Sequence, residues 1–141
     1  IAAVQTQFEG LRFAPTGPRP VVALDWQCTG SGPALFDLAY LLATSADEAV
    51  RRSLEPDLLR SYHQALRAAG VRDYALPQIE EHYRLLLAVV LRAGILLLSI
   101  VELRQAHLRT LATVMLRRAT QANLDHNTEA LLAGLPAAVR G

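Results

Sequence analysis

The chain has 141 residues, of which 52% are apolar and 19% charged, and its formal net charge is +1. This length fits one compact domain or one lobe of a larger protein, and the apolar content is ample for a core. A net charge this close to zero gives no reason to expect nucleic acid or an anionic membrane surface as a partner. All 14 basic residues are arginine, because the sequence contains no lysine.

The single cysteine, Cys28, cannot form an internal disulfide, so the sequence predicts a reducing, cytoplasmic location. The most apolar segment, residues 85–101, contains Arg92 near its centre. A bilayer span needs about 20 apolar residues, and a central arginine is costly there. We therefore expect a buried helix and no membrane association, with Arg92 paired to Asp37 or Glu102.

A β-hairpin is predicted near the N-terminus. Leu11 and Phe13 alternate with a polar residue, a proline- and glycine-rich turn follows, and residues 21–24 form a short apolar strand. Residues 1–8 have no clear period, and the small residues of 28–33 suggest a loop.

From Pro33 onward the apolar spacing becomes helical. The expected helices are one from near Pro33 through Leu42, one from Pro56 to Ala69, one from Pro77 past Glu102, one from Leu108 to Ala122, and a short one through Leu132, capped by Asn123 or Asp125. The fold class is therefore mainly α, a helical lobe with one short N-terminal β-hairpin. Residues 1–141 form a single domain in this interpretation, with 1–27 as hairpin and strand and 33–141 as helical bundle.

Asp25 directly follows the buried strand and precedes a loop of small residues. A carboxylate at a strand end is rigidly placed, which suits a metal or phosphate site. An aspartate that accepts backbone N–H groups in a turn explains the same position. The residue pattern alone leaves both interpretations open.

The stretches "VVALDWQ" and "GPALFDLAYLL" resemble the C-terminal lobe of the aminoglycoside phosphotransferases and choline-kinase-like proteins, which have a protein-kinase-like fold. The resemblance is specific over residues 21–42. It implies that Asp25 binds Mg²⁺ together with ATP, and that Asp37 braces the catalytic loop. It also implies a small-molecule substrate whose hydroxyl accepts phosphate.

Other parts of that family's pattern are not matched. The catalytic aspartate belongs in a His-Gly-Asp motif, and alignment on Leu11 and Phe13 puts Gln5 at its position and Gly10 at that of the second metal ligand. The nucleotide-binding N-terminal lobe and its lysine have no counterpart. We therefore expect no catalytic residue in this chain.

Two hypotheses remain open for the function. In the first, the chain is the C-terminal lobe of an ATP-dependent small-molecule phosphotransferase, a fragment that is inactive alone. In the second, it is a non-catalytic, degenerate kinase-like lobe that serves as a helical binding or scaffold module. A missing lobe would leave an apolar surface near the hairpin, so we expect a tendency to self-associate.

Overall fold

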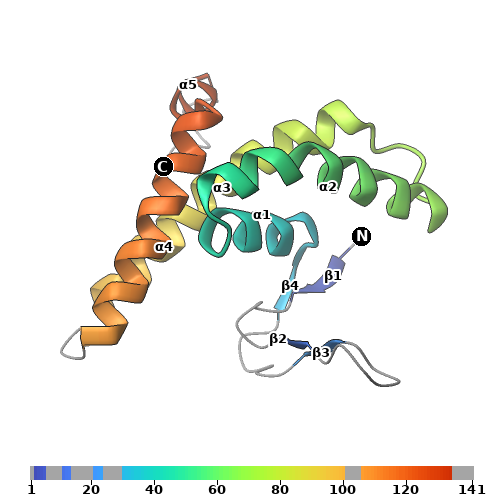
Figure 1. Ribbon diagram of the computed structural model, residues 1–141. Helices are drawn as coiled ribbons and strands as arrows, with labels where there is room; N and C mark the ends of the chain where they lie inside the picture. The colour runs from blue at the N-terminus through green and yellow to red at the C-terminus, as the bar shows by residue number, and fades with distance from the viewer. Residues whose placement is uncertain (1, 6–10, 14–20, 24–29, 101–105, 135–141) are drawn as a thin grey trace.

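The structure, a computed structural model, describes residues 2–5, 11–13, 21–23, 30–100 and 106–134. Within these ranges five helices follow four short strands (Figure 1). The helices are α1 (Leu35–Thr44), α2 (Glu48–Ala68), α3 (Leu76–Ile100), α4 (Ala106–Asp125) and α5 (Thr128–Ala133). The mainly helical fold class predicted from the sequence is confirmed.

The strands form two antiparallel pairs. β2 (Leu11–Phe13) pairs with β3 (Val21–Ala23), which confirms the predicted hairpin, and β1 (Ala2–Gln5) pairs with β4 (Gly30–Pro33). The sequence did not predict this second pair. β4 reads Gly-Ser-Gly-Pro, which lacks apolar alternation and is rich in residues depleted from strands. Its ladder depends on backbone groups brought together from distant parts of the chain.

The core lies where α1 packs against α3 and α4. Ala39 and Ala43 are completely buried on α1, and such small side chains allow the neighbouring helices to approach closely. The other buried apolar side chains come from all four long helices: Leu35, Leu42, Leu59, Ile79, Tyr83, Leu87, Val90, Ala119 and Ala122. Tyr40 packs at the edge of this core, with its ring stacked on Phe36.

Helix α2 begins eight residues before Pro56, the start predicted from the sequence. Its N-cap is Asp47, whose side chain accepts a hydrogen bond from the backbone N–H of Val50 at 3.0 Å. Pro56 therefore lies inside the helix. A proline inside a helix removes one intrahelical hydrogen bond. Pro56 itself is exposed, on the side of α2 that faces solvent.

α2 ends at Ala68, one residue before the predicted end, and Gly70 follows its C-cap, Ala69. Gly70 has a φ of +90°, and the next residue, Val71, donates its backbone N–H to the carbonyl of Leu66. This six-to-one bond is the Schellman pattern, which favours glycine because a Cβ is strained at positive φ. The chain then reverses direction, and α3 runs back beside α2 (Figure 1).

Arg92 is exposed on α3, so the predicted burial of this arginine is wrong. The buried side of α3 runs through Tyr83, Leu87 and Val90, and two positions further on the helix has turned away from the core. The predicted continuation of the helix past Glu102 lies outside the described residues. The helices of the described part do not qualify as membrane spans, since none joins the required length to the required hydropathy.

Candidate functional site

The two strand pairs bring together the residues that flank segments 6–10 and 24–29. Gln5, the last residue of β1, is the register partner of Gly30, the first residue of β4. Leu11, the first residue of β2, is the partner of Ala23, the last residue of β3. Segment 6–10 and segment 24–29 therefore run between the same two pairs of partners, which lie about 5 Å apart in antiparallel pairs.

The residues predicted to carry function belong to or border these segments. Gln5 stands at the end of β1, where the resemblance places the catalytic base. Asp25 follows β3 by two residues and lies outside the described residues, so its role as a metal and cofactor ligand stays a prediction. Asp37 is half-buried in the first turn of α1, just after β4.

A carboxylate in the first helical turn is favoured by the helix dipole, and this explains the position of Asp37 without any ligand. The predicted role of Asp37 as a brace for the catalytic loop therefore stays a prediction as well. The predicted apolar surface near the hairpin falls on residues 1–30, whose side chains are outside the described part of the structure.

The donor set for a metal ion is small. In the described residues no three His, Cys, Asp or Glu side chains gather in a way that could hold a metal ion. Mg²⁺ does not require such a cage, because it commonly binds through one or two carboxylates, substrate phosphates and water. Asp25 alone would fit this mode, whereas Gly10, at the second ligand position, has no side-chain oxygen.

A group of charged and polar side chains joins α2, α3 and the end of α4. We call Arg51, Glu55, Tyr83, Asp125 and His126 the interhelical charge cluster. Arg51 donates from Nη1 to Oε2 of Glu55 at 2.7 Å and from Nη2 to Oδ2 of Asp125. The Tyr83 hydroxyl donates to the same Glu55 oxygen at 3.0 Å, and His126 Nε2 contacts Oε1 of Glu55. The Glu55 carboxylate on α2 thus contacts Arg51 of its own helix, Tyr83 of α3 and His126, which follows α4.

Three side chains of the interhelical charge cluster are buried. The exposed fraction is 2% for Arg51, 7% for Glu55 and 0% for Tyr83. Burial by itself raises the pKa of the Glu55 carboxyl, but the hydrogen bonds and charges of His126 and Arg51 outweigh it, so the net pKa is lowered. Burial and then the Glu55 carboxylate raise the pKa of Tyr83, which keeps its hydroxyl protonated as a donor.

Asp125 extends the cluster to the surface. Arg52 donates to both of its carboxylate oxygens, from Nε at 2.8 Å and from Nη2 at 3.0 Å. This bidentate bond, followed by those from Gln121 and Arg51, lowers the pKa of Asp125 against the smaller opposing effect of burial. The result is a chain of alternating charges from the surface to Glu55.

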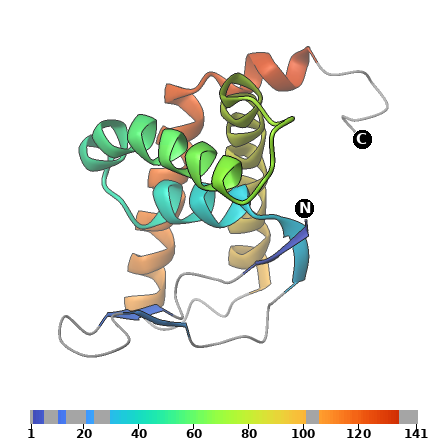
Figure 2. The same ribbon diagram turned by 90° about the vertical axis from the view of Figure 1, so that its right-hand side faces the viewer.

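The interhelical charge cluster lies away from the described strands. α5 and the end of α4 are at the top of both views, whereas the strands lie in the lower half, level with the beginning of α4 (Figures 1 and 2). The arrangement therefore fastens α2 to α3 and α4 and does not form part of the candidate ligand site. Sequence reasoning missed it, because the only local signal is the i,i+4 spacing of Arg51 and Glu55.

Comparison with known proteins finds a kinase-like family that matches part of the chain. A sequence model of the Ecdysteroid kinase-like family matches residues 12–72, which is less than half of the chain. No curated protein and no solved structure gives a significant match. The matched stretch contains β3, Asp25, β4, Asp37 and α2. The chain therefore shares with a kinase-like family the segment that carries both aspartates predicted to serve a phosphotransfer site.

Proposed function

We propose that the chain is the C-terminal lobe of an ATP-dependent small-molecule phosphotransferase that transfers phosphate to a hydroxyl group. The observation that carries the proposal is the family match over residues 12–72, which includes both Asp25 and Asp37. The topology supports it, because segments 6–10 and 24–29 run between the same paired strand ends. The resemblance places the catalytic base at Gln5 and the second metal ligand at Gly10, at the two ends of the first segment, and the first metal ligand, Asp25, in the second.

In this proposal Asp25 binds the nucleotide-bound metal and Asp37 supports the loop beside it. Mg²⁺, when bound with ATP, neutralises charge on the phosphates. Asp37 keeps its backbone position because α1 is anchored in the core through Leu35 and Ala39, on either side of it in the sequence. The described residues thus supply a rigid platform next to the nucleotide, as positioning of phosphates requires.

The isolated chain is not expected to transfer phosphate. Gln5 has no carboxylate to accept the proton of the acceptor hydroxyl, and no lysine exists to grip the phosphates. A protein that supplies the base and the lysine from other residues would complete the site. The acceptor would be a hydroxyl-bearing small molecule, and an ecdysteroid is the first to test because the matching family is named for it.

Titration calorimetry tests the nucleotide site directly. We expect the chain to bind Mg²⁺ and ATP with a Kd in the millimolar range or tighter, and we expect Asp25→Ala to abolish the heat. Asp57→Ala is the matched control, since Asp57 is an exposed aspartate of α2 outside the candidate site. Equal heats for the wild type and Asp25→Ala would contradict the proposal.

The second candidate is a non-catalytic kinase-like binding or scaffold module. It is favoured by the same Gln5 substitution and by the lack of lysine. Absence of nucleotide binding to the folded chain, with or without Mg²⁺, would favour this alternative over the first.

A further inference from the structure

The first turns of α2 are attached differently from the rest of the helix. We call residues 47–54, the N-cap and the turns that follow it, the entry segment of α2. Its apolar side chains, Ala49, Val50 and Leu54, are all exposed, with exposed fractions of 44% for Val50 and 46% for Leu54. Most of the stability of a helix in a protein comes from a buried apolar face. The entry segment has no such face.

Ionic contacts hold the entry segment to α4 instead. Arg52 donates to both carboxylate oxygens of Asp125, from Nε at 2.8 Å and from Nη2 at 3.0 Å. Arg51 donates to the same carboxylate. Because Arg51 is buried, it regains water when the entry segment moves away from α4, and this hydration offsets part of the contacts that are lost.

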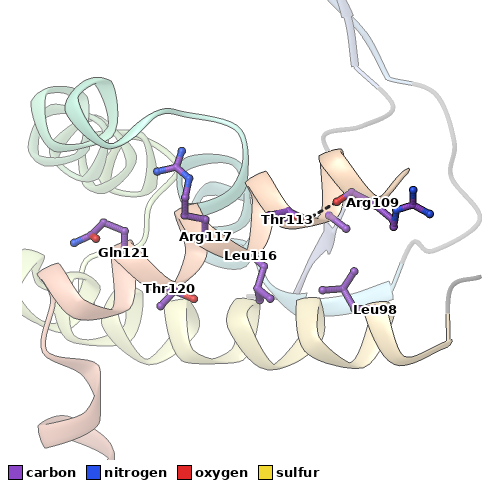
Figure 3. A pocket seen from close by; sticks show the side chains of 8 residues that line it. Leu98, Arg109, Thr113, Leu116, Arg117, Thr120 and Gln121 are labelled. Atoms are coloured by element: carbon purple, nitrogen blue, oxygen red, sulfur yellow. Dashed lines mark hydrogen bonds between the residues drawn. The ribbon is translucent and has the colours of Figure 1, made fainter. Parts of the chain in front are cut away.

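A further contact, between Glu48 and Arg117 of α4, lies on the surface. Figure 3 shows Arg117 at the edge of the groove between α3 and α4, where it projects away from Leu116 and from α3. The exposed fraction is 58% for the side chain of Arg117 and 53% for that of Arg52. Ion pairs with such exposed members contribute little to stability and are weakened by salt.

The second part of α2 is packed into the core. Leu59 is buried, and Leu58, Tyr62 and Leu66 pack against the core from partly buried positions. These side chains recur at three and four residues, so they share one face of the helix. The second part therefore cannot leave the core without exposing apolar surface to water. The entry segment can.

Pro56 separates the two parts of the helix. Proline has no N–H group, so the carbonyl of Arg52 lacks the donor that a helix normally provides four residues later. Just before the proline, Glu55 accepts a 3.0 Å hydrogen bond from the buried Tyr83 of α3. The hydrogen bonds along α2 are thus interrupted next to a side chain that is fixed to α3.

We propose that the entry segment of α2 opens as a local unit, with Pro56 as its hinge, while the rest of the helical bundle stays folded. Opening breaks the ion pairs of Glu48, Arg51 and Arg52 with other helices, but the entry segment withdraws no buried apolar side chain. It therefore requires less free energy than global unfolding. Because two of these ion pairs are on the surface, the opening responds to ionic strength. It does not depend on the proposed phosphotransfer.

Native-state hydrogen exchange of the whole chain, measured by NMR for each backbone amide, tests this proposal. We expect the amides of residues 51–54 to be protected about a hundredfold or more weakly than those of residues 60–67. Low urea concentrations should change the protection of residues 51–54 little, because local opening exposes little surface, but should reduce that of residues 60–67 steeply. Raising NaCl to about 1 M should lower the protection of residues 51–54 about threefold.

Two arginine variants test the ionic attachment. Arg52→Met keeps the apolar stem and removes the bidentate bond to Asp125, so it should lower the protection of residues 51–54 about fivefold. Arg60→Met is the matched control, because Arg60 is an exposed arginine of the second part of α2 and pairs with Asp57 of the same helix. It should leave the protection of residues 51–54 unchanged.

Two further variants test the hinge and the independence of the second part. Pro56→Ala restores a donor for the carbonyl of Arg52 and should raise the protection of residues 51–54 about tenfold or more. Leu58→Ala weakens the packing of the second part and should lower the protection of residues 60–67 about tenfold. It should not affect residues 51–54, because Leu58 stays packed in both the closed and the open form. Circular dichroism confirms that each variant folds.

The proposal is supported if residues 51–54 lose protection in Arg52→Met and at high salt, gain it in Pro56→Ala and keep it in Leu58→Ala and Arg60→Met. Equal protection and equal urea dependence of residues 51–54 and 60–67 would overturn it, since both would then exchange only through global unfolding. Equal loss of protection in the two regions in Leu58→Ala would overturn it for the same reason. Unchanged protection in Pro56→Ala would overturn the hinge.

Discussion

The hydroxyl of Tyr83 donates a 3.0 Å hydrogen bond to Oε2 of Glu55, and this bond links α3 to α2 across 28 positions of the sequence. The same carboxylate contacts His126 through its other oxygen, so three segments meet at one side chain. Burying such a carboxylate costs desolvation free energy. Removing it is also costly, because its buried partners are then left without their acceptor.

Removal of the Glu55 carboxylate should therefore destabilise the fold strongly. Glu55→Ala leaves the buried Arg51 with Asp125 as its remaining acidic partner and takes the acceptor away from Tyr83. We expect a loss of about 3–5 kcal/mol in the free energy of unfolding, measured by urea denaturation. Glu80→Ala, at an exposed position of α3, is the control and should change it by less than about 0.5 kcal/mol. Equal losses in the two variants would show that the cluster does not stabilise the fold.

Stability should fall in acid because of the same cluster. The folded-state pKa values of Glu55 and Asp125 are lowered below their ordinary values near 4, so the unfolded chain binds more protons in this range. The stabilisation is complete above about pH 5 and is lost as the pH falls through the folded-state pKa values. Urea midpoints at neutral and acid pH should show a smaller drop for Glu55→Gln than for the wild type. A drop of the same size in both would contradict this linkage.

The periodic parts of the fold could be predicted from local sequence, and the rest depends on contacts between distant residues. The β2–β3 hairpin, α1 and the end of α2 at Gly70 follow from alternation, helical spacing and a glycine stop. The predicted start of α2 at Pro56 is wrong, because proline is typical of a first helical turn. The actual N-cap is Asp47, whose side chain accepts a hydrogen bond from the backbone N–H of Val50. A proline is a strong boundary signal, but an exposed one inside a long helix is tolerated where packing holds the helix.

The candidate site shows the same division. The strand end at Asp25 and the first helical turn at Asp37 could be read from the sequence, and a kinase-like family model matches this stretch. The β1–β4 pair, which borders segments 6–10 and 24–29, has no apolar pattern from which it could be predicted. The partners of Glu55 include Tyr83 and His126, which are 28 and 71 positions away, and no local pattern identifies such pairs.

Arg118 illustrates how a distant side chain completes a helix end. Its Nη1 donates to the carbonyl of Ser45 at 2.8 Å and lies 3.4 Å from the carbonyl of Thr44, so an arginine of α4 satisfies the end of α1. α1 has no basic residue in its own last turn, where a cation is favoured by the helix dipole. The Nε of Arg118 is buried without a partner in the described structure. Its desolvation offsets part of the stabilisation that the hydrogen bonds of Nη1 provide.

Arg118→Met should therefore destabilise the chain moderately, because it keeps the apolar stem and removes both the cap and the unpaired Nε. A hydrogen bond to a charged group contributes about 1.5–3 kcal/mol, and the removed Nε offsets some of it, so we expect a loss of about 1–2 kcal/mol in thermal or urea unfolding. Arg117→Met is the matched control on the next residue. Arg117 forms only a surface ion pair with Glu48, so its loss should stay within about 0.5 kcal/mol. If Arg117→Met destabilised the chain as much as Arg118→Met, general charge on α4, and not the cap of α1, would explain the effect.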